Sequence, residues 1–300
     1  MAAKVILNPY SGRWRAGESW HEVAPVLRDA GVNFEVVRST KRGEGVQLAA
    51  DAVRAGFSPI IAAGGDGTIG DVINGMMQAV GESASLPSFG VLPLGTANDL
   101  VSNLRLPTNI EDACAVIAAG ETRYMDLCSV NGRYFANNAA LGLEPLVTVL
   151  QERITSLRGI PRYLVAALQA IFRGTSWQAQ LIWDSGSYSG PISLVSVGNG
   201  SRTGGLFYMT PHADLFDGKL TFSYGYVKSR LRMLALLPLT MRPAAGNFVE
   251  QPEVFEGETT RLQVKLTETS PAHADGELFD PALFEADYRI HPGRLPLLIS

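Results

Sequence analysis

The first 120 residues alternate between short apolar stretches and stretches with helical spacing. The apolar stretches, which read as strands, are residues 5–7, 32–37, 60–63 and 89–92. Between the last two, apolar residues recur at the spacing of one helix face, at Ile69, Val72, Ile73, Met76 and Met77. Strands that are apolar throughout are buried on both faces. The alternation therefore predicts an α/β domain with a Rossmann-like, mostly parallel sheet covered by helices on both sides.

The pattern changes near residue 125. Strand candidates at 124–130 and 134–138 flank Asn131-Gly132, a dipeptide favoured in tight hairpin turns. Further strand candidates are 177–183, 192–197, 220–226 and 262–266, and a single helix is predicted at 161–172. We therefore predict an α/β domain at 1–124 and a β-rich, antiparallel, β-sandwich-like domain at 125–300. The last strand candidate, residues 295–299, can pair with either domain, so it can return to the first.

Composition excludes several classes of protein. Lys and Arg number 25 and Asp and Glu 29, and the resulting net charge of −4 gives no general attraction to nucleic acid. Cys114 and Cys128 are too few for a disulfide scaffold or a four-cysteine zinc site, so a reducing, cytoplasmic setting is expected. The most apolar run, 231–241, contains Arg232 and Pro238 and has about half of the roughly 20 residues that a membrane span needs.

Residues 60–69, Ile-Ile-Ala-Ala-Gly-Gly-Asp-Gly-Thr-Ile, place three glycines around one acid between a strand and a helix. Glycine lets the backbone approach a ligand closely, and the start of a helix attracts phosphate. The segment therefore predicts a phosphate-binding loop, with a tight turn capped by Asp66 or Thr68 as the alternative. Its glycines also match the dinucleotide-binding spacing. A dehydrogenase is disfavoured, because Asp66 would face the pyrophosphate and no acid ends the next strand.

Three motifs now point to a family. Gly64-Gly65-Asp66-Gly67-Thr68 is the signature of the superfamily of diacylglycerol kinase-like and NAD kinase-like proteins. Asn8-Pro9-Tyr10-Ser11-Gly12 resembles the N-P-x-S-G loop of the diacylglycerol kinase catalytic domain, and Pro93-Leu94-Gly95-Thr96-Ala97-Asn98-Asp99 resembles its P-L-G-T-x-N-D element. Each motif follows a predicted strand. Over nearly its whole length the chain is similar to the soluble bacterial lipid kinases of this family.

The resemblance implies that these loops hold ATP and that Asp66 holds Mg²⁺, directly or through water. No Gly-Lys-Ser/Thr follows the glycines, so this is not a Walker A loop, and Mg²⁺ and backbone N–H groups must neutralise the phosphates. Gly70-Asp71 stands where the family often has Asn-Glu, which leaves the role of Asp71 open. The implied ATP-binding residues are Asn8, Pro9, Tyr10, Ser11, Gly12, Thr40, Gly64, Gly65, Asp66, Gly67, Thr68, Ile69, Gly70, Thr96, Asn98 and Asp99.

Two acidic motifs occur in the second domain. Asp275-Gly276-Glu277 resembles the family's D-G-E element, in which a carboxylate takes the proton from the lipid hydroxyl. This implies three catalytic residues: Glu277 as general base, Asp275 as its partner or a metal contact, and Asp66. A surface Asp-Gly turn without a catalytic role is the alternative.

The second acidic motif, residues 214–220, resembles an element that holds a structural Mg²⁺ in the family. The implied ligands are the carboxylates of Asp214 and Asp217 and the backbone carbonyl of Lys219. Two acids three residues apart suit a hard cation. An Asp-Gly hairpin turn without metal explains the motif equally well.

The sequence thus predicts an ATP-dependent lipid kinase whose second domain takes the acceptor, with diacylglycerol converted to phosphatidic acid as the first expectation. Sphingoid bases are alternative acceptors, and a NAD kinase-like enzyme or a nucleotide- or lipid-sensing module are alternative functions. A cytoplasmic enzyme would dock on the inner face of the membrane, through Lys228, Arg230, Arg232 and Arg242 around the apolar run 231–241. A solvated helix face is an equal alternative for these residues, and a homodimer is compatible with the sequence.

Overall fold

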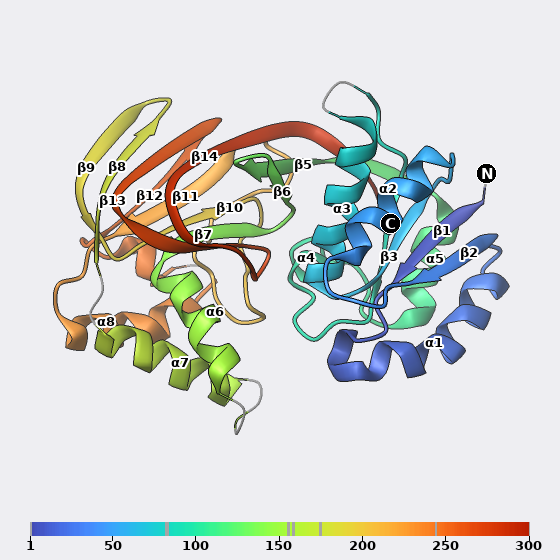
Figure 1. Ribbon diagram of the computed structural model, residues 1–300, viewed down its shortest axis with the longest axis horizontal. Coiled ribbons are helices and arrows are strands. Elements are labelled where there is room, and N and C mark those ends of the chain that lie inside the picture. Colours follow the sequence, from blue (N-terminus) through green and yellow to red (C-terminus); the bar gives the residue numbers. More distant parts are fainter. Residues whose placement is uncertain are drawn as a thin grey trace.

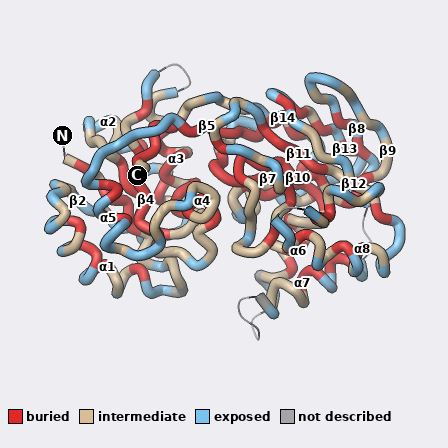
Figure 2. The backbone as a smooth tube through the Cα atoms, turned by 180° about the vertical axis from the view of Figure 1, so that it is seen from behind, coloured by how far each residue is buried: buried red, intermediate tan, exposed pale blue. Residues whose placement is uncertain are grey.

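The computed structural model describes residues 2–81, 84–154, 157, 160–173, 176–243 and 245–299. Two domains lie side by side, and one sheet runs through both (Figure 1). Buried residues are concentrated in the strands, whereas exposed residues are frequent in the helices and loops around them (Figure 2). No helix in the described part of the chain is both long and apolar enough to cross a bilayer.

The N-terminal domain is a parallel sheet with helices on both faces. Its strands, in the order β2, β1, β3, β4 across the sheet, are β2 (Phe34–Arg38), β1 (Ala3–Leu7), β3 (Ile60–Gly64) and β4 (Phe89–Pro93). The helices are α1 (Ser11–Asp29), α2 (Glu44–Arg54), α3 (Asp66–Val80), α4 (Asp99–Asn103) and α5 (Ile110–Ala119). Successive strand residues point to opposite faces. Ile6 packs with α2 and α3, and Val5 with α1 and α5, which confirms the predicted α/β domain.

The C-terminal domain is antiparallel and β-rich, as predicted. Its strands are β5 (Thr122–Val130), β6 (Arg133–Phe135), β7 (Asn138–Gly142), β8 (Trp177–Trp183), β9 (Gly186–Ile192), β10 (Leu194–Gly198), β11 (Leu220–Gly225), β12 (Val254–Thr259), β13 (Arg261–Ala274) and β14 (Glu277–Leu298). Phe135, Leu181 and Phe222 are buried in its core. Asn131 and Gly132 have φ angles of 48° and 82° in the turn between β5 and β6, so the predicted hairpin is confirmed.

The helices of this domain differ from the sequence prediction. Besides α7 (Ile160–Arg173), which matches the predicted helix, there are α6 (Leu143–Arg153), α8 (Arg230–Leu236) and the 3₁₀ helices η1 (Leu237–Met241) and η2 (Phe248–Glu250). α6 follows β7 directly, and its Val147 and Leu150 pack against Ala166 and Ala170 of α7. A helix of 11 residues is marginal by itself, so α6 depends on this packing, which no local pattern reveals.

The two last strands are much longer than the short segments that the sequence predicts. β13 and β14 form one hairpin, and β14 also pairs antiparallel with β5. Near its end, Leu297 pairs in parallel with Phe89 of β4, so β14 begins in the second domain and finishes in the first (Figure 1).

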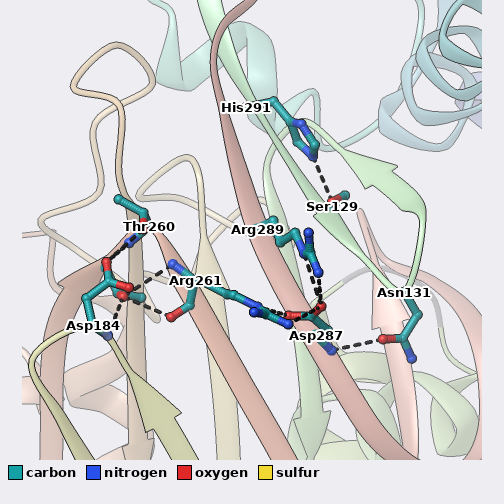
Figure 3. Close-up of polar contacts among 9 residues, drawn as sticks. Ser129, Asn131, Asp184, Thr260, Arg261, Asp287, Arg289 and His291 are labelled. Atoms are coloured by element: carbon teal, nitrogen blue, oxygen red, sulfur yellow. Dashed lines mark hydrogen bonds and ion pairs between the residues drawn. The ribbon is translucent and has the colours of Figure 1, made fainter. Parts of the chain in front are cut away.

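Side-chain contacts hold the open end of this hairpin in register (Figure 3). Arg261 Nε donates to Oδ1 of Asp287 at 2.7 Å, and Arg289 binds the other oxygen of the same carboxylate. The backbone N–H of Asp287 donates to Oδ1 of Asn131 at 2.9 Å. Asp287 therefore joins β13, β14 and the β5–β6 turn.

Candidate functional site

Two glycine loops touch each other at the carboxyl edge of the parallel sheet. A Cβ on Gly95 would lie 2.3 Å from the Cα of Gly65, and a Cβ on Gly64 would lie 2.3 Å from the hydroxyl oxygen of Thr68. No side chain fits at Gly95 or Gly64, so the loops after β3 and β4 present backbone to the edge. Helix α3 begins there, and its N-terminal end contributes positive partial charge.

The loop of residues 8–12 is joined to the same helix end. Asn8 donates from Nδ2 to Oγ1 of Thr68 at 3.1 Å, and Ser11 Oγ lies 3.3 Å from that oxygen. The Tyr10 hydroxyl donates to the carbonyl of Thr40 at 3.3 Å. The four loops that carry the implied ATP-binding residues therefore lie together at this edge.

The loops after β1, β2 and β3 line a cavity of about 630 Å³. Three cations, Lys41, Arg42 and Arg133, also line it, against the two acids Asp71 and Glu277. The excess positive charge adds to that of the helix end, which suits a polyphosphate. None of the three belongs to a motif, so the sequence did not predict them. Arg133 comes from the β5–β6 hairpin, beyond the segments that carry the N-terminal motifs.

The residues predicted to bind ATP divide into three groups. Those lining this cavity are Asn8, Tyr10, Ser11, Gly65, Gly67 and Thr68. Those lining a second cavity, of about 720 Å³ between the domains, are Asp66, Thr96 and Asp99. Those in the same segments but lining neither are Pro9, Gly12, Thr40, Gly64, Ile69, Gly70 and Asn98.

The Asp275-Gly276 dipeptide makes the turn between β13 and β14, with φ angles of 48° and 75°. The Asp275 carboxylate accepts hydrogen bonds from the backbone N–H groups of residues 136, 137 and 138, at 2.9, 2.9 and 3.1 Å. Burial raises its pKa to about 6. Asp275 thus fixes the start of β7, a structural task that its motif did not reveal.

Glu277 follows that turn and lines the first cavity. A Cβ on Gly67 would lie 3.0 Å from its Oε1, so the carboxylate packs against the first turn of α3. Arg42 donates from Nε to Oε2 at 3.0 Å and makes a second, shorter contact from Nη2. The turn of the second domain therefore meets the glycine loop of the first.

Buried carboxylates gather where the domains meet. Burial raises the pKa of Asp66, and burial together with the charge of Asp66 raises the pKa of Asp99 to about 6. The Asp66 charge also acts on Asp275. Carboxylates that oppose one another's ionisation are stabilised by a cation.

These carboxylates alone do not supply enough ligands for a magnesium ion. In the described ranges, no three Asp, Glu, His or Cys side chains converge on a point that could hold a metal. Mg²⁺ commonly takes one or two carboxylates and completes its shell with phosphate oxygens and water. Asp66 therefore suits a Mg²⁺ that arrives with a nucleotide.

The second acidic motif forms a turn before β11. Asp214 accepts a hydrogen bond from the N–H of Phe216 at 3.0 Å, and Asp217 from the N–H of Lys219 at 2.9 Å. Burial, with the charges of Asp214 and Glu258, raises the pKa of Asp217. The structure thus brings Asp214 and Asp217 close together. The Mg²⁺ site at Asp214, Asp217 and the carbonyl of Lys219 stays a prediction.

Comparison with known proteins assigns each half of the chain to a known domain family. Residues 2–130 match the diacylglycerol kinase catalytic domain, and residues 137–299 match the YegS C-terminal NAD kinase beta sandwich-like domain. The chain belongs to the diacylglycerol kinase/YegS family of lipid kinases. This bears out the resemblance drawn from the three N-terminal motifs and Asp275-Gly276-Glu277.

Named relatives agree with the assignment. A protein of Chromohalobacter salexigens named "Probable lipid kinase YegS-like" is 31% identical, over 90% of this chain and 85% of its own. A diacylglycerol kinase of Staphylococcus carnosus is 27% identical, over 92% of this chain and 88% of its own. The crystal structure of a diacylglycerol kinase from Bacillus anthracis has the same fold, with a TM-score of 0.75 at 18% identity over 100% of this chain and 97% of that one.

Proposed function

We propose that the protein transfers the γ-phosphoryl group of ATP to the hydroxyl of a lipid, with diacylglycerol as the first acceptor to test. One observation carries the proposal. The turn that contains Asp275 and Glu277 packs against the first residues of α3, between the cavity with the glycine loops and the cavity between the domains. Family membership supports a lipid kinase, and this junction is where donor and acceptor can meet.

On the donor side, the residues of the 630 Å³ cavity suit a triphosphate. Backbone N–H groups at the start of α3 and the side chains of Lys41, Arg42 and Arg133 would bind phosphate oxygens. Mg²⁺ held by Asp66 would neutralise phosphate charge when bound. Phosphoryl transfer depends chiefly on positioning and charge, so these groups would supply most of the catalysis.

Glu277, which lines the donor-side cavity next to the Asp275-Gly276 turn, would accept the proton of the lipid hydroxyl. Its contacts with Arg42 and Gly67 hold the carboxylate in one place, which a general base needs. Asp275 would act through the backbone that it fixes rather than by touching substrate.

The acceptor would be reached at a membrane surface. On α7 and α8, which contact each other along one side of the second domain (Figure 1), Phe172 and Leu231 are 57% and 79% exposed. Lys228 and Arg230 are exposed beside Leu231, whereas Arg232 is bound to Glu253 at 2.8 Å and is unavailable for lipid. Exposed apolar residues beside cations suit an anionic bilayer.

The proposal is tested by incubating the protein with Mg²⁺, ATP and a total lipid extract, then comparing the lipids before and after by mass spectrometry. A parallel reaction contains NAD in place of lipid. We expect a lipid mass increase of one phosphate that needs Mg²⁺. Phosphorylation of NAD alone, or nucleotide binding without any phosphorylated lipid, would reject the proposal in favour of a NAD kinase-like enzyme or a sensing module.

A further inference from the structure

The short strand β6 of the second domain lies against helix α3 of the first. It pairs with β5 along one edge, and among the described residues it pairs with no other strand. Tyr134 packs against the apolar cluster that contains Ile69 and Ile73 of α3, whereas the next residue, Phe135, is buried in the core of the second domain. Both domains therefore fix β6, and its first residue, Arg133, lies where they meet.

Asn74 of α3 takes the place that a neighbouring strand would have beside β6. Its Nδ2 donates to the carbonyl of Tyr134 at 2.8 Å, and its Oδ1 accepts from the N–H of Tyr134 at 2.9 Å. Nδ2 also donates to the carbonyl of Gly70 at 2.8 Å, one turn earlier on α3, which orients the amide. Edge strands usually leave such backbone groups unpaired. One side chain therefore determines where β6 lies on α3.

Arg133 has a buried donor without an acceptor. Its side chain lines the 630 Å³ cavity together with Asp71 and Glu277. Within the part of the chain that the structure describes, nothing accepts a hydrogen bond from its Nε, although that atom is shielded from solvent. A buried donor without a partner is unfavourable. A natural protein keeps one where water, an ion or a ligand completes it.

The surroundings of Arg133 indicate which ligand this is. Burial, and then the charge of Glu277, raises the pKa of Asp71 to about 6, and the positive charges of Arg133 and Arg42 act on the same pKa in the opposite direction. These charged groups are therefore near one another. Arg42 is held by Glu277, whereas Nε of Arg133 can still take an acceptor. If Glu277 receives the proton of the acceptor hydroxyl, the phosphoryl group that is transferred must lie beside these residues.

We propose that Arg133 binds the γ-phosphoryl group of ATP and stabilises its charge during transfer, and that Asn74 is the positioning residue that holds Arg133 there. This inference rests on the proposed lipid kinase function. A planar guanidinium binds two phosphate oxygens at once and stays charged throughout. The second domain then supplies a cation to the donor site as well as the general base.

The charge that Arg133 meets changes during the step itself. The acceptor oxygen bonds to the γ-phosphorus while the bond from this phosphorus to the β,γ-bridging oxygen breaks. ADP keeps the electron pair of the broken bond, and the hydroxyl proton passes to Glu277. Arg133 neither gains nor loses a proton, so it acts by electrostatic stabilisation. An arginine in this role contributes about 10³–10⁵-fold to kcat in other phosphoryl-transfer enzymes.

The first test compares the binding of ATP and ADP by isothermal titration calorimetry, with Mg²⁺ and without lipid. ADP lacks the γ-phosphoryl group. Arg133→Gln should therefore raise Kd for ATP by about tenfold or more, the effect of losing a hydrogen bond to a charged group, and change Kd for ADP by less than about twofold. Equal changes for both nucleotides would place Arg133 elsewhere along the nucleotide. Unchanged binding of both would mean that water completes Nε, and either result would overturn the inference.

Arg289→Gln is the matched control for both assays. Arg289 is an exposed arginine of the same domain and lines neither cavity. Its partner Asp287 is also bound by Arg261, so the hairpin keeps its register. We expect this variant to behave as the wild type.

Phosphate transfer to the total lipid extract at saturating ATP gives the second readout. Arg133→Gln should lower this rate by about 100-fold or more, even though saturation offsets the weaker binding of ATP. Arg133→Lys keeps the charge but not the planar group, so it should recover ATP affinity more fully than the rate. A normal rate in Arg133→Gln would overturn the inference.

Asn74 is tested by a double-mutant cycle on the same rate. Asn74→Ala removes both hydrogen bonds to Tyr134, and the rate should fall by about tenfold or more because Arg133 is displaced. Combined with Arg133→Gln, it should cause almost no further loss, since it acts through Arg133. Losses that multiply would show a separate structural role and reject the positioning role. Asn74→Asp, which keeps an acceptor for the N–H of Tyr134, replaces Asn74→Ala in the cycle if the latter does not fold.

Failure of this inference is distinguishable from failure of the proposed function, because nucleotide binding needs no acceptor. A wild type that binds ATP but phosphorylates no lipid rejects the proposed function, and the comparison of ATP with ADP then still decides where Arg133 binds. A wild type that phosphorylates lipid, with Arg133→Gln unchanged in both assays, rejects the inference alone.

Discussion

Arg42, in the loop after β2, donates two hydrogen bonds to the carboxylate of Glu277 at the start of β14. The two residues are 235 positions apart in the sequence and belong to different domains. Their contact joins the glycine-loop cavity to the hairpin turn of the second domain, so the geometry of the site depends on how the domains meet.

If Glu277 is the general base, Glu277→Gln should lower kcat by about 10²–10⁴-fold, the usual contribution of proton transfer. Binding of ATP should change little, because a glutamine fills the same space. Single-turnover kinetics and nucleotide titration measure the two effects. Near-normal turnover would remove Glu277 from the chemistry, and Glu285→Gln should behave as the wild type.

Gly67 and Gly70 both lie on α3, so their alanine variants can be compared directly. A Cβ at Gly67 would lie 3.0 Å from Glu277 Oε1 and must displace it, whereas a Cβ at Gly70 would make an ordinary 3.5 Å contact with Asp275. Gly67→Ala should therefore lower kcat by about tenfold or more. Gly70→Ala should cause a smaller loss of turnover and raise the free energy of unfolding by up to about 1 kcal/mol. Equal kinetic effects of the two variants would contradict this geometry.

Asp275→Ala should destabilise the protein by about 3 kcal/mol or more, because three buried N–H groups lose their acceptor. Urea unfolding measures the change. Asp280→Ala is the control, since that carboxylate accepts one hydrogen bond, from the N–H of Ala282. If the two variants unfold at the same urea concentration, Asp275 does not fix the start of β7.

Asp71 should make stability depend on pH. Burial and the charge of Glu277 raise its pKa from 3.8 to about 6. A raised pKa means that the folded state binds the proton more tightly than the unfolded state. The resulting stability is present below pH 4 and is lost as pH rises through about 6. Asp71→Asn should therefore be more stable than the wild type at pH 7.5, by about 1 kcal/mol after solvent screening.

This advantage of Asp71→Asn should disappear near pH 4, where both side chains are neutral. Thermal unfolding across that pH range measures it. Asparagine keeps the shape of the side chain, which matters because a Cβ on Gly45 would lie only 2.8 Å from the Asp71 Cβ. An advantage that does not vary with pH would mean that packing, and not charge, causes the difference.

Membrane docking through the start of α8 predicts that the double variant Lys228→Glu, Arg230→Glu loses sedimentation with vesicles rich in anionic lipid. Each cation near such a surface contributes about 1 kcal/mol. Arg232→Glu is a poor control, because Arg232 lies on α8 itself and binds Glu253. Arg54→Glu, on α2 of the other domain, serves instead, since the ion pair that it breaks with Asp51 is exposed and contributes little to stability. Equal binding of the double variant and the wild type would place the docking surface elsewhere.

Most of the loops around the 630 Å³ cavity could be predicted from sequence. The motifs at residues 8–12 and 64–68 are local, and each follows a strand whose apolar character determines its place in a parallel sheet. Because such strands end at one edge, these loops had to meet there. The Asn131-Gly132 hairpin was predictable for the same reason, since the turn conformation depends on the residues themselves.

Contacts between distant segments could not be predicted in this way. Helix α6 forms against α7, Arg42 meets Glu277, and Glu144 meets His273 129 positions later. The sequence by itself determined the fold class, the family and the loops at the sheet edge, because these follow from local spacing. Only the tertiary structure decided which side chains from distant segments meet, because the pairing of β13 with β7 places His273 beside the start of α6.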